Sequence, residues 1–259
     1  MDSRLRAVVT VATVGVALLA SGSAVAGTGA LAGSLSRHAW GGAEEVPGIA
    51  ALNQGGNAEI ASVSCASAGN CSAGGQYMDS SVRRQAFVVS QANGTWGAAI
   101  EVPGTAALNQ GGNAFITSVS CASAGNCSAG GDYLDNSRGH QAFVVSQAHG
   151  IWGTAIEVPG TAALNHGNAD LTSVSCASAG NCGAGGHYTD SSSRQQAFVV
   201  SQANRTWHVA VEVPGTAALN QGGFAGISSV SCASAGNCGA GGYYKDSSGH
   251  IQAFVVSEK

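Results

Sequence analysis

The stretch Ser62-Val-Ser-Cys-Ala-Ser-Ala-Gly-Asn-Cys71 decides the fold of this chain, because it occurs four times without a single change. The other three copies begin at Ser118, Ser173 and Ser229. Each copy is followed by Gln-Ala-Phe-Val-Val-Ser, and successive tryptophans of the chain lie 55 or 56 residues apart. Self-similarity at a fixed period is the signature of a repeat architecture, so one structural unit is predicted to occur four times.

Each unit is predicted to form four short antiparallel strands. In the second copy, hydrophobic residues alternate with Ser and Thr from Ile116 to Cys121, which is typical of a strand with one buried face. Further strands are predicted at 127–133, 141–146 and 152–158, with turn-forming residues between them. No segment combines a helical period with capping residues, so helix should be nearly absent. A four-stranded unit of about 56 residues has the size of a propeller blade, whereas a solenoid rung made of strands is shorter.

The two ends of the chain complement each other. The last copy stops after the segment 252–257, so it lacks the strand that begins with Trp in the other copies. That strand is found at the other end, at 40–48, before the first complete copy. A closed ring would use it to complete the last blade and would leave no exposed sheet edge. We therefore predict an all-β fold: a four-bladed β-propeller with four antiparallel strands per blade, closed by an N-terminal strand, in a single domain at 40–259.

The first 26 residues have the three parts of a secretory signal peptide. Two arginines precede an apolar run at 7–20, and small residues follow at 24–26, where a signal peptidase would cut. A membrane anchor is the alternative, but the run is short for a permanent span. We expect residues 1–26 to be removed and 27–39 to form a short linker. The protein should then be extracellular and bacterial, with no stable membrane span after cleavage.

Composition excludes two classes of protein. The formal net charge is −4 and only 9% of the residues are charged, so there is no basic surface for a phosphate backbone and nucleic acid is not an expected partner. A hydrophobic content of 44% with sparse charge is the opposite of the composition of disordered chains. The chain is long enough to bury one substantial core or several small ones.

The eight cysteines form four Cys-x5-Cys pairs that bracket the turn between the first two strands of each unit. The pairs are Cys65/Cys71, Cys121/Cys127, Cys176/Cys182 and Cys232/Cys238. Side chains in these positions face each other across adjacent strands, and an even count in an exported protein indicates disulfides. Metal binding and free thiols are the alternatives, although this spacing without a nearby histidine pair is poor for zinc. We predict no metal and no cofactor.

These motifs resemble the secreted bacterial propellers built from Ser-Cys-x5-Cys repeats, which are distant relatives of Asp-box propellers of the sialidase type. The resemblance covers about residues 36–259 and includes the turn Asn93-Gly-Thr-Trp96. An Asp-box runs Ser-x-Asp-x-Gly-x-x-Trp, whereas the segment 90–96 is one residue shorter and lacks the Asp. In such families the Asp-box is an element of the fold, so the resemblance implies a propeller scaffold and no chemistry.

The repeated polar residues are the candidate ligand-binding residues. They are an Asp that follows a Tyr by two residues, and an Asn in the connection between units: Asp79, Asp135, Asp190 and Asp246; Tyr77, Tyr133, Tyr188 and Tyr244; Asn53, Asn109, Asn165 and Asn220. In a propeller they would share one rim. Carboxylate and amide groups beside an aromatic ring suit sugar hydroxyls, and a weak contact repeated four times gains avidity on a polymer. The alternative is that each Asp accepts backbone N–H groups within its own turn and each Tyr is partly buried.

The remaining polar residues give no catalytic pattern. The seven histidines are mostly unrepeated; only His140 and His250 are taken as equivalent, so we expect surface positions and no cluster with ligand spacing. The Glu before each Val-Pro-Gly is expected to be a solvated charge at a sheet edge. A sialidase-like site would need three arginines that bind the carboxylate of the substrate. The groups of a catalytic site must also differ from one another, whereas the repeated units are nearly identical.

We therefore expect a non-catalytic binding or interaction module rather than an enzyme. Its partner would be a glycan or cell-envelope polymer recognised through one rim, or a protein. One alternative is a sialidase-like glycoside hydrolase or lyase that uses the rim carboxylates. A second alternative is a purely structural or protein-binding repeat protein.

Overall fold

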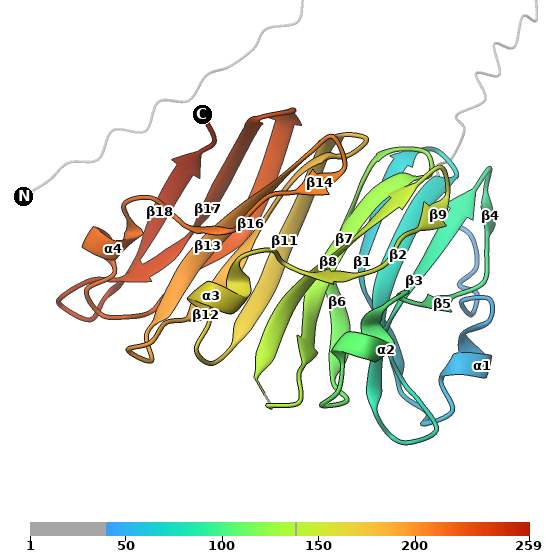
Figure 1. The fold of residues 1–259 in the computed structure, drawn as a ribbon. Coiled ribbons are helices and arrows are strands. Elements are labelled where there is room, and N and C mark those ends of the chain that lie inside the picture. The colour runs from blue at the N-terminus through green and yellow to red at the C-terminus, as the bar shows by residue number, and fades with distance from the viewer. Residues whose placement is uncertain (1–39, 138) are drawn as a thin grey trace, which may run out of the picture. The chain divides into compact units, whose positions relative to one another are not determined.

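The computed structural model describes residues 40–137 and 139–259 (Figure 1). The predicted signal peptide and linker lie outside these residues. Residues 44–259 form one compact unit, which consists of four antiparallel sheets, one from each copy of the repeat. Within the described part of the chain, no helix is long and apolar enough to cross a membrane. The all-β prediction is thus confirmed.

The first three sheets have five strands each, and the fourth has three. The first sheet contains β1 (Ala58–Ser67), β2 (Asn70–Met78), β3 (Arg84–Ala92), β4 (Thr95–Trp96) and β5 (Ile100–Glu101). The second contains β6 (Ala114–Ser123), β7 (Asn126–Leu134), β8 (His140–Ala148), β9 (Ile151–Trp152) and β10 (Ile156–Glu157). The third contains β11 (Ala169–Ser178), β12 (Asn181–Thr189), β13 (Gln195–Ala203), β14 (Thr206–Trp207) and β15 (Val211–Glu212). The fourth contains β16 (Ala225–Ser234), β17 (Asn237–Lys245) and β18 (Ile251–Ser257).

The predicted fourth strand of each unit is divided into two strands of two residues. In the second sheet both β9 and β10 pair with β8, through Trp152 opposite Gln147 and Ile156 opposite Val144. Between them the chain leaves the ladder after Gly153, whose N–H still donates to Ser146. The two short strands therefore form a fourth, interrupted row beside the three long strands of the sheet.

A one-turn helix in each connection was not predicted from the sequence pattern. These helices are α1 (Ile49–Leu52), α2 (Thr105–Leu108), α3 (Thr161–Leu164) and α4 (Thr216–Leu219). Each follows a Pro-Gly pair, and the glycine takes a left-handed conformation, with φ of 91° at Gly104. Four residues are too few to show a hydrophobic period, which is why the pattern gives no signal for them.

The predicted disulfides are present in all four units. Within each unit the two cysteines are direct cross-strand partners, as in Cys121 opposite Cys127, where the Cα atoms are 4.0 Å apart. The same bonds join Cys65 to Cys71, Cys176 to Cys182 and Cys232 to Cys238. Each bond closes the hairpin between the first two strands of its sheet.

Neighbouring sheets pack through a large residue on one sheet and glycines on the other. Ile116, Leu171 and Ile227 each project from the first strand of a sheet onto the second strand of the preceding sheet. Leu171 is fully buried, and a side chain added at Gly130 would come within 2.8 Å of it. The glycines that thin the second strand are therefore needed for close approach of the sheets.

The closure predicted between residues 40–48 and 252–257 is not observed. β18 pairs with β17 alone, and Val255 on β18 is 89% exposed. Residues 44–48 contain no strand. Instead, the carbonyl of Pro47 accepts the N–H of Ala99 at 2.7 Å, which ties this segment to the first sheet as Pro103 is tied to the second.

Candidate functional site

The repeated polar residues lie at one end of each sheet, here called the turn end, which carries the one-turn helix and the turn between the second and third strands (Figure 1). The opposite end carries the disulfide hairpin. The connection after α2 reaches the turn of the first sheet, because Arg83 donates to the carbonyl of Asn109 at 2.9 Å. Arg194 makes the same bond to Asn220 at 2.8 Å. The turn ends of the first three sheets therefore combine residues from two successive units, whereas that of the fourth sheet has no following connection.

The repeated aspartates hold their own turns. Asp79 accepts the backbone N–H groups of Ser81 and Arg83 through Oδ1, and the side chain of Gln85 through Oδ2 at 2.9 Å. Equivalent bonds are made by Asp135, Asp190 and Asp246. Partial burial tends to raise the pKa of Asp79, but these hydrogen bonds together outweigh it and lower the pKa. A carboxylate held in its charged form is a hydrogen-bond acceptor rather than an acid.

The repeated asparagines extend this network to the next unit. Asn109 is buried, and its Nδ2 donates to Gln85 Oε1 at 2.9 Å, so that Asp79, Gln85 and Asn109 form a chain of hydrogen bonds. Asn165 bonds Gln141 and Asn220 bonds Gln196 in the same way. Asn53 precedes the first sheet and instead accepts the N–H of Asn57.

Three of the four repeated tyrosines are buried, and their hydroxyls are bound to glutamates, whereas Tyr244 of the fourth sheet is half-buried. Tyr133 is 3% exposed, and its hydroxyl donates to Glu157 at 3.3 Å. Tyr77 donates to Glu101 and Tyr188 to Glu212. Burial, and then the neighbouring carboxylate, raise the pKa of all three tyrosines. All four repeated glutamates were expected to be solvated edge charges. Glu45 is exposed as expected, whereas the three that bind the tyrosine hydroxyls are half-buried.

Two adjoining hollows open at the turn end of the second sheet. One, of about 360 Å³, is lined by Tyr133, Asp135, Gln141 and Asn165 among others, and the other, of about 430 Å³, shares Gln141 and Asn165 with it. Polar residues of the turn and of the connection that follows line both, and Ala107, Leu108 and Gln110 of the preceding connection also line the first. The structure thus brings the predicted Tyr, Asp and Asn of the second unit to one surface hollow.

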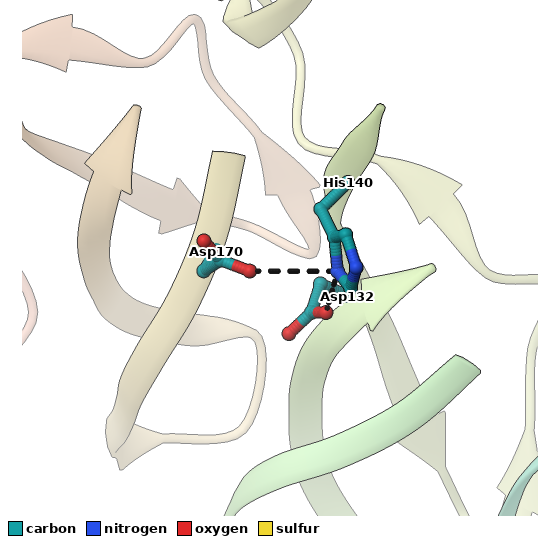
Figure 2. A group of neighbouring side chains, drawn as sticks. All are labelled: Asp132, His140 and Asp170. Atoms are coloured by element: carbon teal, nitrogen blue, oxygen red, sulfur yellow. Dashed lines mark hydrogen bonds and ion pairs between the residues drawn. The ribbon is translucent and has the colours of Figure 1, made fainter. Parts of the chain in front are cut away.

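A second group of polar side chains lies between the second and third sheets. Figure 2 shows Asp132 of β7 and His140 of β8 beside Asp170 of β11. His140 Nδ1 is 2.7 Å from Asp132 Oδ2 and 3.7 Å from Asp170 Oδ1. On the far side of Asp170, Oδ2 is 3.0 Å from Nε2 of His187 on β12. We call Asp132, His140, Asp170 and His187 the junction cluster.

Local structure brings the cluster together. Asp170 and His187 are direct cross-strand partners in the third sheet. In the second sheet Asp132 is opposite Ala142, two residues from His140, so its side chain lies diagonal to the histidine on the same face. The main chain of His140 is held from the connection, because its N–H donates to Asn168 Oδ1 at 3.1 Å.

The two carboxylates of the cluster differ in their environment. Asp132 is 1% exposed, whereas Asp170 is 28% exposed. Burial is the largest effect on Asp132 and raises the pKa of this carboxyl well above its usual range; the charge of Asp170 acts in the same direction and is only partly offset by His140. Asp132 and His140 can thus share a proton across their hydrogen bond, and a metal cation could take the place of that proton.

The same positions carry other chemistry between the other sheets. Between the first and second sheets, the Arg84 guanidinium lies 6.0 Å from the ring centre of Phe115. Between the third and fourth sheets, Gln195 Nε2 donates to the Tyr243 hydroxyl at 2.9 Å. Arg84 and Gln195 occupy the place of His140 in their sheets. The junction cluster is therefore specific to one interface.

This cluster was not predicted from the sequence, and the expectation of surface positions was wrong for His140 and His187, whereas His149, His166, His208 and His250 are exposed as expected. His140 and His187 are half-buried beside Asp132 and Asp170 rather than free on the surface. His140 is also not equivalent to His250, because Ile251 occupies its place in the fourth sheet. An alignment of the four copies could have pointed to the cluster, since its positions are among the few at which the copies differ.

Comparison with protein families and with curated proteins finds no match. Among solved structures, the chain is similar to the Hadza microbial sialidase Hz136, with a TM-score of 0.49 and 11% sequence identity. The similar region covers 78% of this chain and 46% of that protein, so the chain spans about half the length of the sialidase. What the sites can do is therefore argued from their own residues.

Proposed function

We propose that this chain is an exported, non-catalytic binding module that recognises a glycan or cell-envelope polymer through its turn end. One observation carries the proposal: the Asp–Gln–Asn chain of hydrogen bonds recurs at successive sheets, and in the second sheet it lines two polar hollows. A repeated weak contact suits a repeating polymer, because linked sites bind with an avidity that no single site has.

Export is supported by the cysteines and by the start of the sequence. Four disulfides persist only in an oxidising compartment, and the first 26 residues have the pattern of a signal peptide. Removal of these residues would leave no other long apolar segment in the sequence.

The scaffold is proposed to be a four-bladed propeller that closes on itself. Two exposed faces support this proposal. On the first sheet, Val63 is 56% exposed, whereas its counterpart Val119 is buried against the preceding sheet. On the fourth sheet, Gly239 has open space where its counterpart Gly183 meets the disulfide of the next sheet. The two faces are complementary, and residues 40–45 would add the missing outer strand beside β18.

The turn carboxylates favour binding over hydrolysis. A general acid in a glycosidase needs a raised pKa, whereas hydrogen bonds lower the pKa of Asp79, Asp135 and Asp190. Acceptors fixed in the charged state are suited to hydroxyl groups of a sugar. Tyr77, Tyr133 and Tyr188 would contribute little stacking area, because their rings are buried.

The test is binding to a glycan array and to insoluble cell-envelope polymers, with turnover of chromogenic glycosides measured in parallel. The variant Q54A/Q110A/H166A/Q221A changes exposed side chains of the four turn ends and leaves the aspartate network intact. The control T95A/I151A/T206A changes exposed residues at the disulfide end. We expect binding without turnover, weakened at least about tenfold in the first variant and unchanged in the control.

Turnover of any glycoside by the unmodified chain would refute the non-catalytic proposal. Equal binding by the two variants would refute the use of the turn end. Circular dichroism of both variants shows whether the sheets are retained.

A further inference from the structure

We infer that the junction cluster is a binding site for one divalent first-row transition-metal ion, with Asp132, His140 and Asp170 as its ligands. Neither the repeat pattern nor the proposed glycan recognition assigns a role to these residues. The inference is independent of the turn end, since it concerns the packed interface between the second and third sheets.

The ligand atoms lie close to the separations that such an ion requires. Zinc and similar ions bind imidazole nitrogen and carboxylate oxygen at about 2.0–2.2 Å, which places neighbouring ligand atoms about 3.0–3.5 Å apart. One ligand atom from each of Asp132, His140 and Asp170 lies within 4.8 Å of the other two, and the two separations from His140 Nδ1, 2.7 and 3.7 Å, bracket the required value. Side-chain rotations that bring the two carboxylate oxygens closer together would complete the site.

The charges of the cluster favour a divalent cation. Two carboxylates face one another across the interface, and one of them is almost completely buried. A buried carboxylate is costly unless it is paired or coordinates a metal. A divalent ion would neutralise both carboxylates, and it would replace the proton held between Asp132 and His140.

The donor set selects the class of metal. Imidazole with carboxylate suits zinc, cobalt, nickel, iron or manganese, whereas calcium and magnesium prefer oxygen ligands alone. His187 is a positioning residue, because its ring contacts the second oxygen of Asp170 at 3.0 Å and would fix the carboxylate towards the ion. His140, Asp170 and His187 are each 23–28% exposed, so an ion could enter from solvent.

The equivalent positions at the other two packed interfaces hold different residues. The other two packed pairs of sheets have Arg84 on Phe115 or Gln195 on Tyr243 at the same place. Two carboxylates and two imidazoles are therefore not needed for packing, although the sheets are otherwise built from nearly identical sequences. An ion bound here would join β7 and β8 to β11 and clamp the two sheets together.

The experiment is titration of the disulfide-bonded, chelator-treated chain with Zn²⁺ by calorimetry and with Co²⁺ by visible absorption. We expect one equivalent of either ion to bind, with the Co²⁺ band showing nitrogen and oxygen ligands. H140Q and D170N should weaken affinity by about 100-fold or more, and H187Q by about 10-fold without loss of the Co²⁺ band. H250Q is the matched control, because His250 lies 3.8 Å from Asp246 in an exposed pair.

The variant H140R/D170F transfers the residues of the first interface to the second and should fold but bind no Zn²⁺. It keeps the test valid if H140Q or D170N fails to fold. The inference is overturned if Zn²⁺ does not saturate at one equivalent, if H140R/D170F binds as tightly as the unmodified chain, or if Mg²⁺ and Ca²⁺ compete equally with Zn²⁺. Glycan binding is measured separately on the zinc-free chain, so the two proposals can fail independently.

Discussion

The turn end and the interfaces between sheets differ in how the four copies use them. At the turn end the same Asp, Gln and Asn make the same hydrogen bonds in successive units, as Asp79 and Gln85 do in the first. At the interfaces the packing residues are alike, but the polar positions beside them change from Arg84 on Phe115 to the junction cluster. Residues that hold a unit together are thus constant within this chain, whereas residues that meet across units can vary.

The largest expected effect compares a packed interface with an open face. Leu171 and Ile60 occupy equivalent positions, but Leu171 is fully buried and Ile60 is 38% exposed. Replacing Leu171 with Ala should lower the free energy of unfolding by about 2–5 kcal/mol, because it leaves a cavity. I60A should cost less than about 1 kcal/mol if the first sheet keeps the open face seen in the structure, and about as much as the Leu171 substitution if the ring closes as proposed. Urea denaturation measures both, so an equal cost would support closure in solution and a small cost of I60A would contradict it.

The next effect is a pH dependence of opposite sign in the two regions. Burial raises the pKa of Asp132, which faces His140, Asp170 and His187, so its contribution to stability is present at low pH and lost as pH rises above about 4. Hydrogen bonds lower the pKa of Asp79, so its contribution is present at neutral pH and lost on acidification.

Urea denaturation in chelator from pH 3 to 8 tests these signs. D132N should remove the loss of stability that occurs as the pH rises above about 4. D79N should remove the loss of stability that occurs on acidification. If both variants change the free energy of unfolding in the same pH range, the inferred environments of Asp132 and Asp79 are wrong.

The smallest effect concerns the hydrogen-bond chain of the turn end. Gln141 joins Asp135 to Asn165, so Q141A should cost about 1–2 kcal/mol by leaving a half-buried network without its middle member. Gln252 is exposed and bonds Asp246 alone, so Q252A should cost less than about 0.5 kcal/mol. Thermal unfolding of the two variants gives the comparison, and equal shifts would show that the link to Asn165 adds no stability.

Much of the fold could be predicted because its determinants are local. Alternating hydrophobic and polar residues mark Ile116–Cys121 as a strand, and a five-residue turn brings Cys121 opposite Cys127 whatever surrounds it. The turn role of the aspartates, offered as the alternative to ligand binding, could be recognised for the same reason, since Asp79 bonds residues two and four positions away. The division of the outer strand after Gly153 had no comparable signal.

The sequence by itself determined how many units there are, the order of the long strands and the four disulfides, because each depends on contacts within a few tens of residues. Only the tertiary structure decided which variable side chains meet. Asp132 and Asp170 lie 38 residues apart on different sheets, and their contact depends on how one sheet twists and packs on the next. Pairing of the two ends depends on sheet orientation in the same way. Complementary sequence predicts it, but in this structure β18 keeps a free edge.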